Sequence, residues 1–231
     1  MVDQPRVASL HRYPVKSMLG EQVRFLDVDE RGCVGDRRWS VRTATGKIGS
    51  GKNTRRFAAV SGLLLMRAQE RNGAVVVTFP DGAGWAVDGE KAAERLSRQV
   101  GQPVTLAPES TVSHFDDGPV SLLGHASVAA VARERGEPVD VPRFRANLLV
   151  DGLSAFAEEA WIGRRLHIGT AVLHVSAASP RCVMVNAETA DLPAQPGNLA
   201  AIGRLSNGQL GVVATVVRAG RISVGDDLTV E

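Results

Sequence analysis

The sequence predicts a mostly β fold of the α+β class, closed or barrel-like, with a few short helices. Of its 231 residues, 44% are hydrophobic and 23% are charged, which is ordinary for a globular protein. The 24 glycines and 11 prolines separate short apolar segments, as in strands joined by turns. Roughly a dozen such segments lack the regular strand–helix alternation of a doubly wound sheet, so a barrel-like architecture is favoured.

The first half of the chain reads mainly as strands. Strands are expected at residues 7–13, 22–28, 36–42, 57–69, 74–79 and 104–107. Arg71-Asn72-Gly73 is a hairpin signal. Period two would place Arg37 and Trp39 on one strand face. Residues 89–100 carry apolar side chains at helical spacing and predict an amphipathic helix.

A polar stretch, residues 108–118, divides the chain into expected domains 1–110 and 111–231. In the second, residues 125–135 read as a helix, and short helical turns are expected at 156–161 and 199–205. Strands are expected at 120–123, 143–150, 165–176, 210–218 and 228–230, and Asn207-Gly208 is a hairpin signal. Period two in residues 143–150 puts Arg143, Arg145 and Asn147 on one face, which suits an anion pocket and a solvent-facing strand about equally.

The net charge of +2 is too small to indicate nucleic acid as the main partner. Its distribution is more informative, because residues 31–56 contain eight basic residues against Asp36 alone. Such an excess suggests an anionic ligand, although for any single residue a solvated strand surface is the favoured interpretation. The basic residues are Arg31, Arg37, Arg38, Arg42, Lys47, Lys52, Arg55 and Arg56.

Cys33 and Cys182 are the only cysteines. A disulfide scaffold and a four-cysteine iron–sulfur site are therefore excluded. Residues 1–10 carry Asp3, Gln4 and Arg6 where a signal peptide needs an apolar core. No apolar run approaches the length of a membrane span. We expect a cytoplasmic protein without a membrane span.

Residues 179–182, Ser-Pro-Arg-Cys, close the strand-like run 165–176 and open a loop. Pro180 stiffens the backbone that enters Arg181, whose permanent charge favours the thiolate form of Cys182. A rigid strand end is a usual place for a reactive group. A lone cysteine is nevertheless most often a small buried hydrophobe, and from these four residues alone that interpretation is favoured.

Other segments offer polar groups for an anion. Lys16 and Ser17 lie at the centre of a loop shaped by Pro14 and Gly20, where an ammonium and a hydroxyl can hold an oxyanion. The glycine-rich residues 46–53 lack the spacing of a P-loop. Asp116 and Asp117 precede a Gly-Pro turn, where carboxylates most often accept backbone hydrogen bonds. Each signal is weak when taken alone.

Taken together, these segments give the chain a resemblance to a known family. It resembles the MOSC family of molybdenum-cofactor proteins, in the longer form that has an N-terminal MOSC β-barrel domain. That form includes the mitochondrial amidoxime-reducing component and its bacterial relatives. The matching segments are residues 11–17, 35–41, 144–148, 158–168, 179–182 and 220–226, and the similarity spans nearly the whole chain from the first segment to the last.

The resemblance implies a MOSC-type β-barrel, a Mo-molybdopterin cofactor, and a thiolate from Cys182 as the protein ligand of molybdenum. It gives cofactor-binding roles to Lys16, Ser17, Arg37, Arg145, Asn147, Arg181 and, in an acidic loop, Asp116 and Asp117. Where many relatives have a different basic segment, this chain offers Lys52 or Arg55, and the sequence does not decide between them.

The resemblance also implies an oxidoreductase, independent of pyridoxal phosphate, that reduces small N-oxygenated (N-hydroxylated) compounds. Because the chain has no flavin, haem or iron–sulfur fingerprint, a separate electron donor is expected, namely a ferredoxin, a flavoprotein or a haem protein. A sulfur carrier that holds a persulfide on Cys182 is the alternative. A binding module that holds the cofactor without catalysis is a third interpretation.

Overall fold

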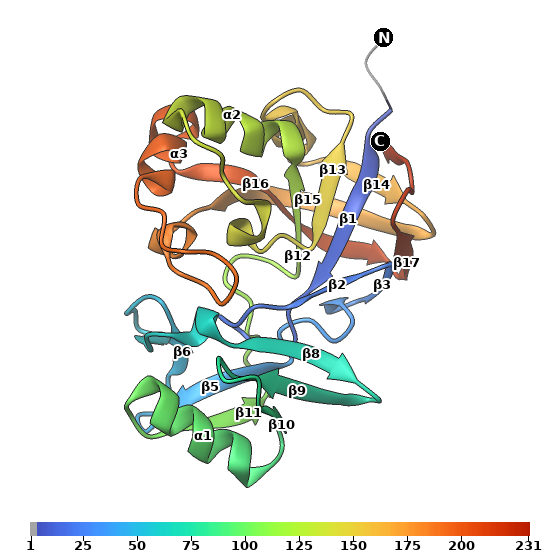
Figure 1. The fold of residues 1–231 in the computed structure, drawn as a ribbon. Coiled ribbons are helices and arrows are strands. Elements are labelled where there is room, and N and C mark those ends of the chain that lie inside the picture. Colours follow the sequence, from blue (N-terminus) through green and yellow to red (C-terminus); the bar gives the residue numbers. More distant parts are fainter. Residues whose placement is uncertain (1–3) are drawn as a thin grey trace.

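The computed structural model describes residues 4–231 and confirms a mostly β protein with a curled half-barrel sheet and three α-helices (Figure 1). Residues 1–3, including Asp3 from the segment that is unlike a signal peptide, lie outside the described residues. Within them, no helix has both the length and the apolar character needed to cross a membrane.

The largest sheet has eight strands and contains strands from both ends of the chain. Its neighbours pair antiparallel, except for β12 and β13, which run parallel. The N-terminal strand β1 pairs with β13, so the chain start completes a sheet that is otherwise built from the second half. In order across the sheet, the strands are β18 (Leu228–Val230), β14 (Arg165–Ile168), β15 (Ala171–Pro180), β16 (Gln209–Arg218), β12 (Val120–Gly124), β13 (Leu148–Asp151), β1 (Arg6–Arg12) and β2 (Glu21–Val23).

Helices α2 (His125–Arg135) and α3 (Asn198–Ser206) lie together beside this sheet (Figure 1). Val128 and Val131 of α2 share a core with Ile202 of α3. Three short 3₁₀ turns, η2 (Val141–Phe144), η3 (Ala157–Trp161) and η4 (Val183–Asn186), connect the strands at this end.

The N-terminal half adds two smaller sheets below the large one in Figure 1. They share a separate core with helix α1 (Glu90–Val100), which buries Ala92 and Leu96. One sheet is ordered β11 (Val104–Pro108), β5 (Trp39–Thr43), β6 (Ile48–Ser50), β7 (Phe57–Ala59), and the other β10 (Gly84–Ala86), β9 (Ala74–Thr78), β8 (Arg67–Arg71). A third, ordered β17 (Gly220–Ser223), β3 (Phe25–Asp29), β4 (Gly32–Cys33), joins both halves of the chain.

Several predicted elements are confirmed. Helices α1 and α2 lie where the apolar spacing predicts them. The Asn72-Gly73 turn joins β8 and β9, whose end residues Arg71 and Ala74 pair directly. Both turn residues have positive φ, at 51° and 79°, as a two-residue hairpin of this kind requires.

Other predicted elements were wrong. In residues 36–42 the strand begins only at Trp39, and Arg37 has a left-handed backbone, so the two do not share a strand face. In residues 143–150 the strand begins at Leu148. Residues Val141–Phe144 form the 3₁₀ turn η2, and Pro142 lies at its second position, for which its fixed φ is suitable. The predicted strand 57–69 is interrupted by the 3₁₀ turn η1 (Leu63–Leu65), and the Asn207-Gly208 turn caps α3 rather than forming a hairpin.

Candidate functional site

A cavity of about 200 Å³ lies between the large sheet and the N-terminal sheets. Its walls come from both halves of the chain and carry six cationic side chains against two carboxylates. The polar lining is Lys16, Ser17, Arg37, Ser50, Lys52, Asp116, Asp117, Ser121, Arg143, Arg145, Ser179, Arg181 and Cys182, and Phe144, Pro180, Met184, Val185 and Val213 are among the remaining lining residues. Two further carboxylates outside the wall also pair with these cations, Asp36 with Arg37 and Asp140 with Arg143 at 3.7 Å, so the six cations exceed their four carboxylates by two.

Three lining residues have an unusual backbone. Ser17, Arg37 and Arg145 have φ of 65°, 49° and 53°, and they are three of the six non-glycine residues with positive φ in the described chain. Such conformations cost about 1–3 kcal/mol each and concentrate at functional sites. The Arg37 amide donates to the distant Tyr13 carbonyl at 2.8 Å, whereas the Arg145 amide donates to the Pro142 carbonyl at 3.2 Å and so closes the 3₁₀ turn η2. The left-handed backbone at Arg37 and Arg145 thus sets the direction in which these two cationic side chains leave the chain.

Lys16 lies on the wall with a side chain that is only 1% exposed. Its Nζ donates to Asp116 Oδ2 at 2.6 Å, and Lys52 Nζ lies 3.0 Å from the other carboxylate oxygen. Burial lowers the pKa of Lys16 to about 8, although Asp116 counteracts part of that effect. Burial alone would raise the pKa of Asp116, but the two lysines outweigh it and hold that pKa well below its usual range. One carboxylate is therefore shared by two ammonium groups.

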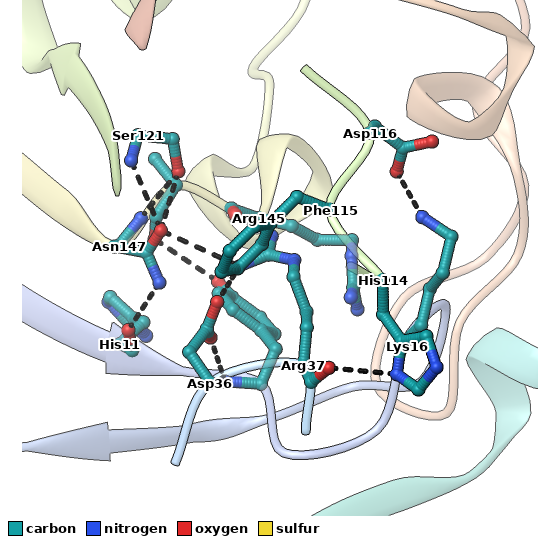
Figure 2. Close-up of polar contacts among 12 residues, drawn as sticks. His11, Lys16, Asp36, Arg37, His114, Phe115, Asp116, Ser121, Arg145 and Asn147 are labelled. Carbon is teal, nitrogen blue, oxygen red and sulfur yellow. Dashed lines mark hydrogen bonds and ion pairs between the residues drawn. The ribbon is translucent and has the colours of Figure 1, made fainter. Parts of the chain in front are cut away.

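Arg37 is held by Asp36 and Asn147, neither of which lines the cavity; Figure 2 shows the polar contacts around these residues. Arg37 pairs with Asp36, whose side chain is fully buried and also accepts the Tyr13 amide at 2.7 Å. Burial alone would lower the pKa of Arg37, but this ion pair outweighs it and raises the pKa. The Asn147 Oδ1 accepts from Arg37 at 3.5 Å and from the Ser121 hydroxyl at 2.9 Å.

Asn147 is 1% exposed and does not line the cavity. Its Nδ2 donates to the His11 carbonyl at 3.2 Å, and its Oδ1 also accepts the Ser121 amide at 3.1 Å. Both ends of the side chain amide are therefore used within the protein. The structure places Asn147 as a support for Arg37, one layer behind the position expected from the family resemblance.

Arg145 and Arg181 complete the cationic wall. Arg145 lies over the Tyr13 ring at 4.4 Å and donates to the Met18 carbonyl. Arg181 donates to the carbonyls of Leu210 at 2.8 Å and Phe144 at 2.9 Å. Burial lowers the pKa of each guanidinium to about 10, and for Arg145 the nearby Arg37 lowers it further. Both remain charged at neutral pH, at an energetic cost that a bound anion would reduce.

His114 fixes the segment that leads to Asp116. It is fully buried, with Nδ1 at 3.0 Å from the Arg37 carbonyl and Nε2 at 3.0 Å from Ser40 Oγ. Burial lowers the pKa of His114 to about 4, so the ring is neutral near pH 7. The contact between His114 and the Arg37 carbonyl joins the loop that carries Asp116 and Asp117 to the backbone at Arg37, and residues from both segments line the cavity.

The two cysteines have different surroundings. Cys182 follows the end of β15, is partly exposed and lies on the cavity wall. Cys33 is fully buried in the core of the large sheet, and burial raises its pKa. Among residues 4–231, no three His, Cys, Asp or Glu side chains are grouped as a metal site. A metal here would take one protein sulfur and its other ligands from elsewhere.

Of the eleven residues that the family resemblance offers for the cofactor, nine line the cavity and two do not. Arg55 is exposed and outside the wall, whereas Lys52 lies on it, and Asn147 lies behind it. Sequence reasoning did not assign Ser50, Ser121, Arg143 or Met184 to the wall. Arg143 had a signal, since it was placed with Arg145, but the others had none because tertiary packing alone brings them here.

The fold and site define a β protein with a cationic cavity and one accessible thiol. Comparison with known families assigns it more closely: the profile described as "MOSC domain" matches residues 109–229, and "MOSC N-terminal beta barrel domain" matches residues 4–113. The chain belongs to the MOSC family.

Similarity to individual proteins is more distant. The chain is 35% identical over 77 residues to mitochondrial amidoxime reducing component 2 of Bos taurus, covering 33% of this chain and 22% of that protein. It is 30% identical over 145 residues to molybdenum cofactor sulfurase of Drosophila ananassae, covering 59% of this chain and 18% of that protein. It thus spans about a fifth of the length of these curated relatives.

A solved structure supports the fold. The YuaD protein from Bacillus subtilis superposes with a TM-score of 0.55 at 18% identity, over 99% of this chain and 96% of that one. The two proteins therefore share a fold.

Proposed function

We propose that this protein holds a molybdenum cofactor in the cationic cavity, with the Cys182 thiolate as ligand of the metal, and that it reduces N-oxygenated compounds. The observation that carries the proposal is the wall itself, where an accessible sulfur lies among six cations and only two carboxylates. Support also comes from relatives named for amidoxime reduction and for the molybdenum cofactor.

The residues suit the chemistry of this group. A soft thiolate is an appropriate ligand for a metal that already has dithiolene sulfurs. The phosphate of the pterin is an anion, and Lys16, Arg37 and Arg145 would offer charged donors for it. Lys16 and Arg37 have carboxylate partners, whereas Arg145 has no ion-pair partner among the described residues. Asp116 and Asp117 offer acceptors for pterin N–H groups. When bound, the cofactor supplies the two-electron redox chemistry that no side chain can supply.

The chain's own residues position and charge the site. Asp36 and Asn147 fix the Arg37 guanidinium from behind. Lys16 Nζ, with a pKa of about 8, holds a proton at neutral pH and can release it more readily than an ordinary lysine. Breaking the N–O bond of an N-hydroxy compound consumes two electrons and two protons and releases water. A separate donor protein, a ferredoxin, flavoprotein or haem protein, would deliver the electrons.

Metal analysis and turnover test the proposal together. Protein made in a host that synthesises the cofactor is expected to contain molybdenum and pterin, and Cys182→Ser is expected to lose the metal. Cys33→Ser is the matched control, since Cys33 is buried in the core and outside the cavity. Reduction of hydroxylamine by loaded protein with a low-potential dye is expected. Loaded protein that turns over no N-oxygenated compound refutes the reductase assignment.

A sulfur carrier is the second candidate. The accessibility of Cys182 and the sulfurase names of several relatives favour it. It predicts a mass increase of one sulfur atom on Cys182 without stoichiometric molybdenum. Stoichiometric molybdenum without turnover would instead indicate a protein that binds the cofactor only.

A further inference from the structure

Phe57, the first residue of β7, is buried and does not line the cavity, but its ring contacts two cations that do. Lys16 Nζ lies 4.6 Å and Lys52 Nζ 5.0 Å from the centroid of the ring. Arg56, outside the wall, lies over the same ring at 5.0 Å. The face of an aromatic ring carries partial negative charge. Phe57 therefore attracts two ammonium groups that share a single carboxylate, that of Asp116.

Tyr13, the only tyrosine of the chain, has the same relation to two arginines of the wall. It is buried outside the lining, with the guanidinium carbons of Arg37 and Arg145 at 5.0 Å and 4.4 Å from its ring centroid. Burial raises the pKa of Tyr13 to about 12, so the ring is a neutral phenol near pH 7. Neither Arg145 nor Arg181 pairs with a carboxylate of residues 4–231, and Arg181 lies over the Phe144 ring at 5.7 Å. The two cations in excess of the carboxylates are thus both placed on aromatic rings.

A ring and a carboxylate stabilise a buried cation in different ways. A carboxylate cancels the charge, so the positive potential in the cavity falls. A ring has no net charge, so it lowers the cost of burying the cation and leaves the positive potential for an anion. We infer that Tyr13 and Phe57 are positioning residues of the anion site, which hold four wall cations in place and charged in the ligand-free protein. The inference rests on the proposed function only for the identity of the anion, the pterin phosphate.

Fluorination of the Phe57 ring tests the attraction without removing the side chain. Fluorine withdraws charge from the ring face and nearly preserves its shape, so trifluorophenylalanine at position 57 weakens the contacts with Lys16 and Lys52. It is expected to raise the unfolding equilibrium constant of the ligand-free protein, measured in urea, by about fivefold. The control is the same replacement at Phe79, a buried ring whose cation, Arg95, lies at 5.4 Å and is partly exposed. There the expected change is less than about twofold.

A double-mutant cycle with Lys16→Met separates attraction for a cation from packing of the ring. Without the Lys16 charge, trifluorophenylalanine at position 57 is expected to raise the unfolding constant by only about twofold. An undiminished effect in the Lys16→Met protein, or an equal effect at Phe79, overturns the inference.

Anion binding is the second measurement, with inorganic phosphate as the probe in calorimetry of the ligand-free protein at pH 7. Tyr13→Leu is expected to weaken phosphate binding by about fivefold, whereas Tyr13→Phe, which keeps the ring, is expected to stay within about twofold of wild type. Equal weakening by both variants, or a folded wild type that binds no phosphate, overturns the inference. Wild-type protein that behaves as expected in these tests but takes up no molybdenum retains the two rings as positioning residues and refutes the cofactor assignment instead.

Discussion

Replacing Lys16 by methionine is expected to stabilise the protein while removing its capacity for the cofactor. Lys16 is 1% exposed and has one carboxylate partner, Asp116, which it shares with Lys52. Methionine has a similar length and no charge. Replacing a buried ion by an apolar side chain of similar volume is often stabilising, because the cost of removing the charge from water disappears.

The pKa of Lys16 gives the magnitude. The pKa falls from the ordinary 10.5 to about 8. This fall means that the folded protein destabilises the charged form of Lys16, relative to the neutral form, by roughly 3 kcal/mol more than water does. Asp116 loses one of its two partners in the variant, so we expect a net gain of about 2 kcal/mol in the free energy of unfolding near pH 7.

The pH dependence has a definite sign. Because the folded pKa is the lower one, the unfolded chain binds more protons between about pH 8 and pH 10.5, and wild-type stability rises with pH in that window. The methionine variant lacks this rise. The difference in the free energy of unfolding between Lys16→Met and wild type is therefore expected to decrease by about 2 kcal/mol from pH 7 to pH 9.5.

Urea unfolding of both proteins without cofactor, at the two pH values, measures the gap. Other groups that titrate, such as Cys33, are present in both proteins and cancel in the difference. Lys47→Met, at an exposed lysine, is the control and is expected to change stability by less than about 0.5 kcal/mol at either pH. A gap that does not change with pH, or a variant less stable than wild type by more than about 1 kcal/mol, refutes the reasoning.

The remaining predictions concern charge and support at the cavity. Lys52→Gln is expected to lower the molybdenum content measured by mass spectrometry, and Arg55→Gln to leave it unchanged, because only Lys52 lies on the wall; equal losses would contradict this assignment. Asp36→Asn leaves Arg37 buried without a counter-ion and is expected to lower the free energy of unfolding by about 3 kcal/mol. A loss under about 1 kcal/mol in urea would show that the pair is not needed. Asn147→Leu is expected to reduce both stability, by about 2 kcal/mol, and molybdenum content, whereas a residue that only touched the cofactor would change content alone.

Local sequence patterns predicted the parts of the fold that depend on local chemistry. The Asn72-Gly73 hairpin and helices α1 and α2 are set by turn residues and by apolar spacing within the segment itself. The turns at Arg37 and Arg145 could not be predicted in this way. Period two favoured a strand at both, but both have a left-handed backbone. The Arg37 amide donates to the Tyr13 carbonyl, and the Arg145 guanidinium donates to the Met18 carbonyl. These partners are distant in the sequence, and only the complete fold brings them near.

The same limit applies to the site. Motif resemblance found nine wall residues but gave Asn147 the same role as its neighbours, because a motif records which residues occur and not which of them face the cavity. The two residues differ in how far their polar groups are satisfied within the protein. Asn147 has hydrogen-bond partners for both ends of its amide. Arg145 donates to the Met18 carbonyl and lies over the Tyr13 ring, but it has no carboxylate partner among the described residues.

The placement of β1 explains why the charged groups meet at all. By pairing with β13 it joins the large sheet, and the loop that follows it carries Lys16 and Ser17 to the cavity that Cys182 also lines. Burying these cations together costs stability in the ligand-free protein, as the lowered pKa values of Lys16, Arg145 and Arg181 show. An anion that binds there removes part of this cost, so its binding energy also stabilises the junction between the two halves. The charge surplus at this junction thus makes ligand binding and the assembly of the fold mutually dependent.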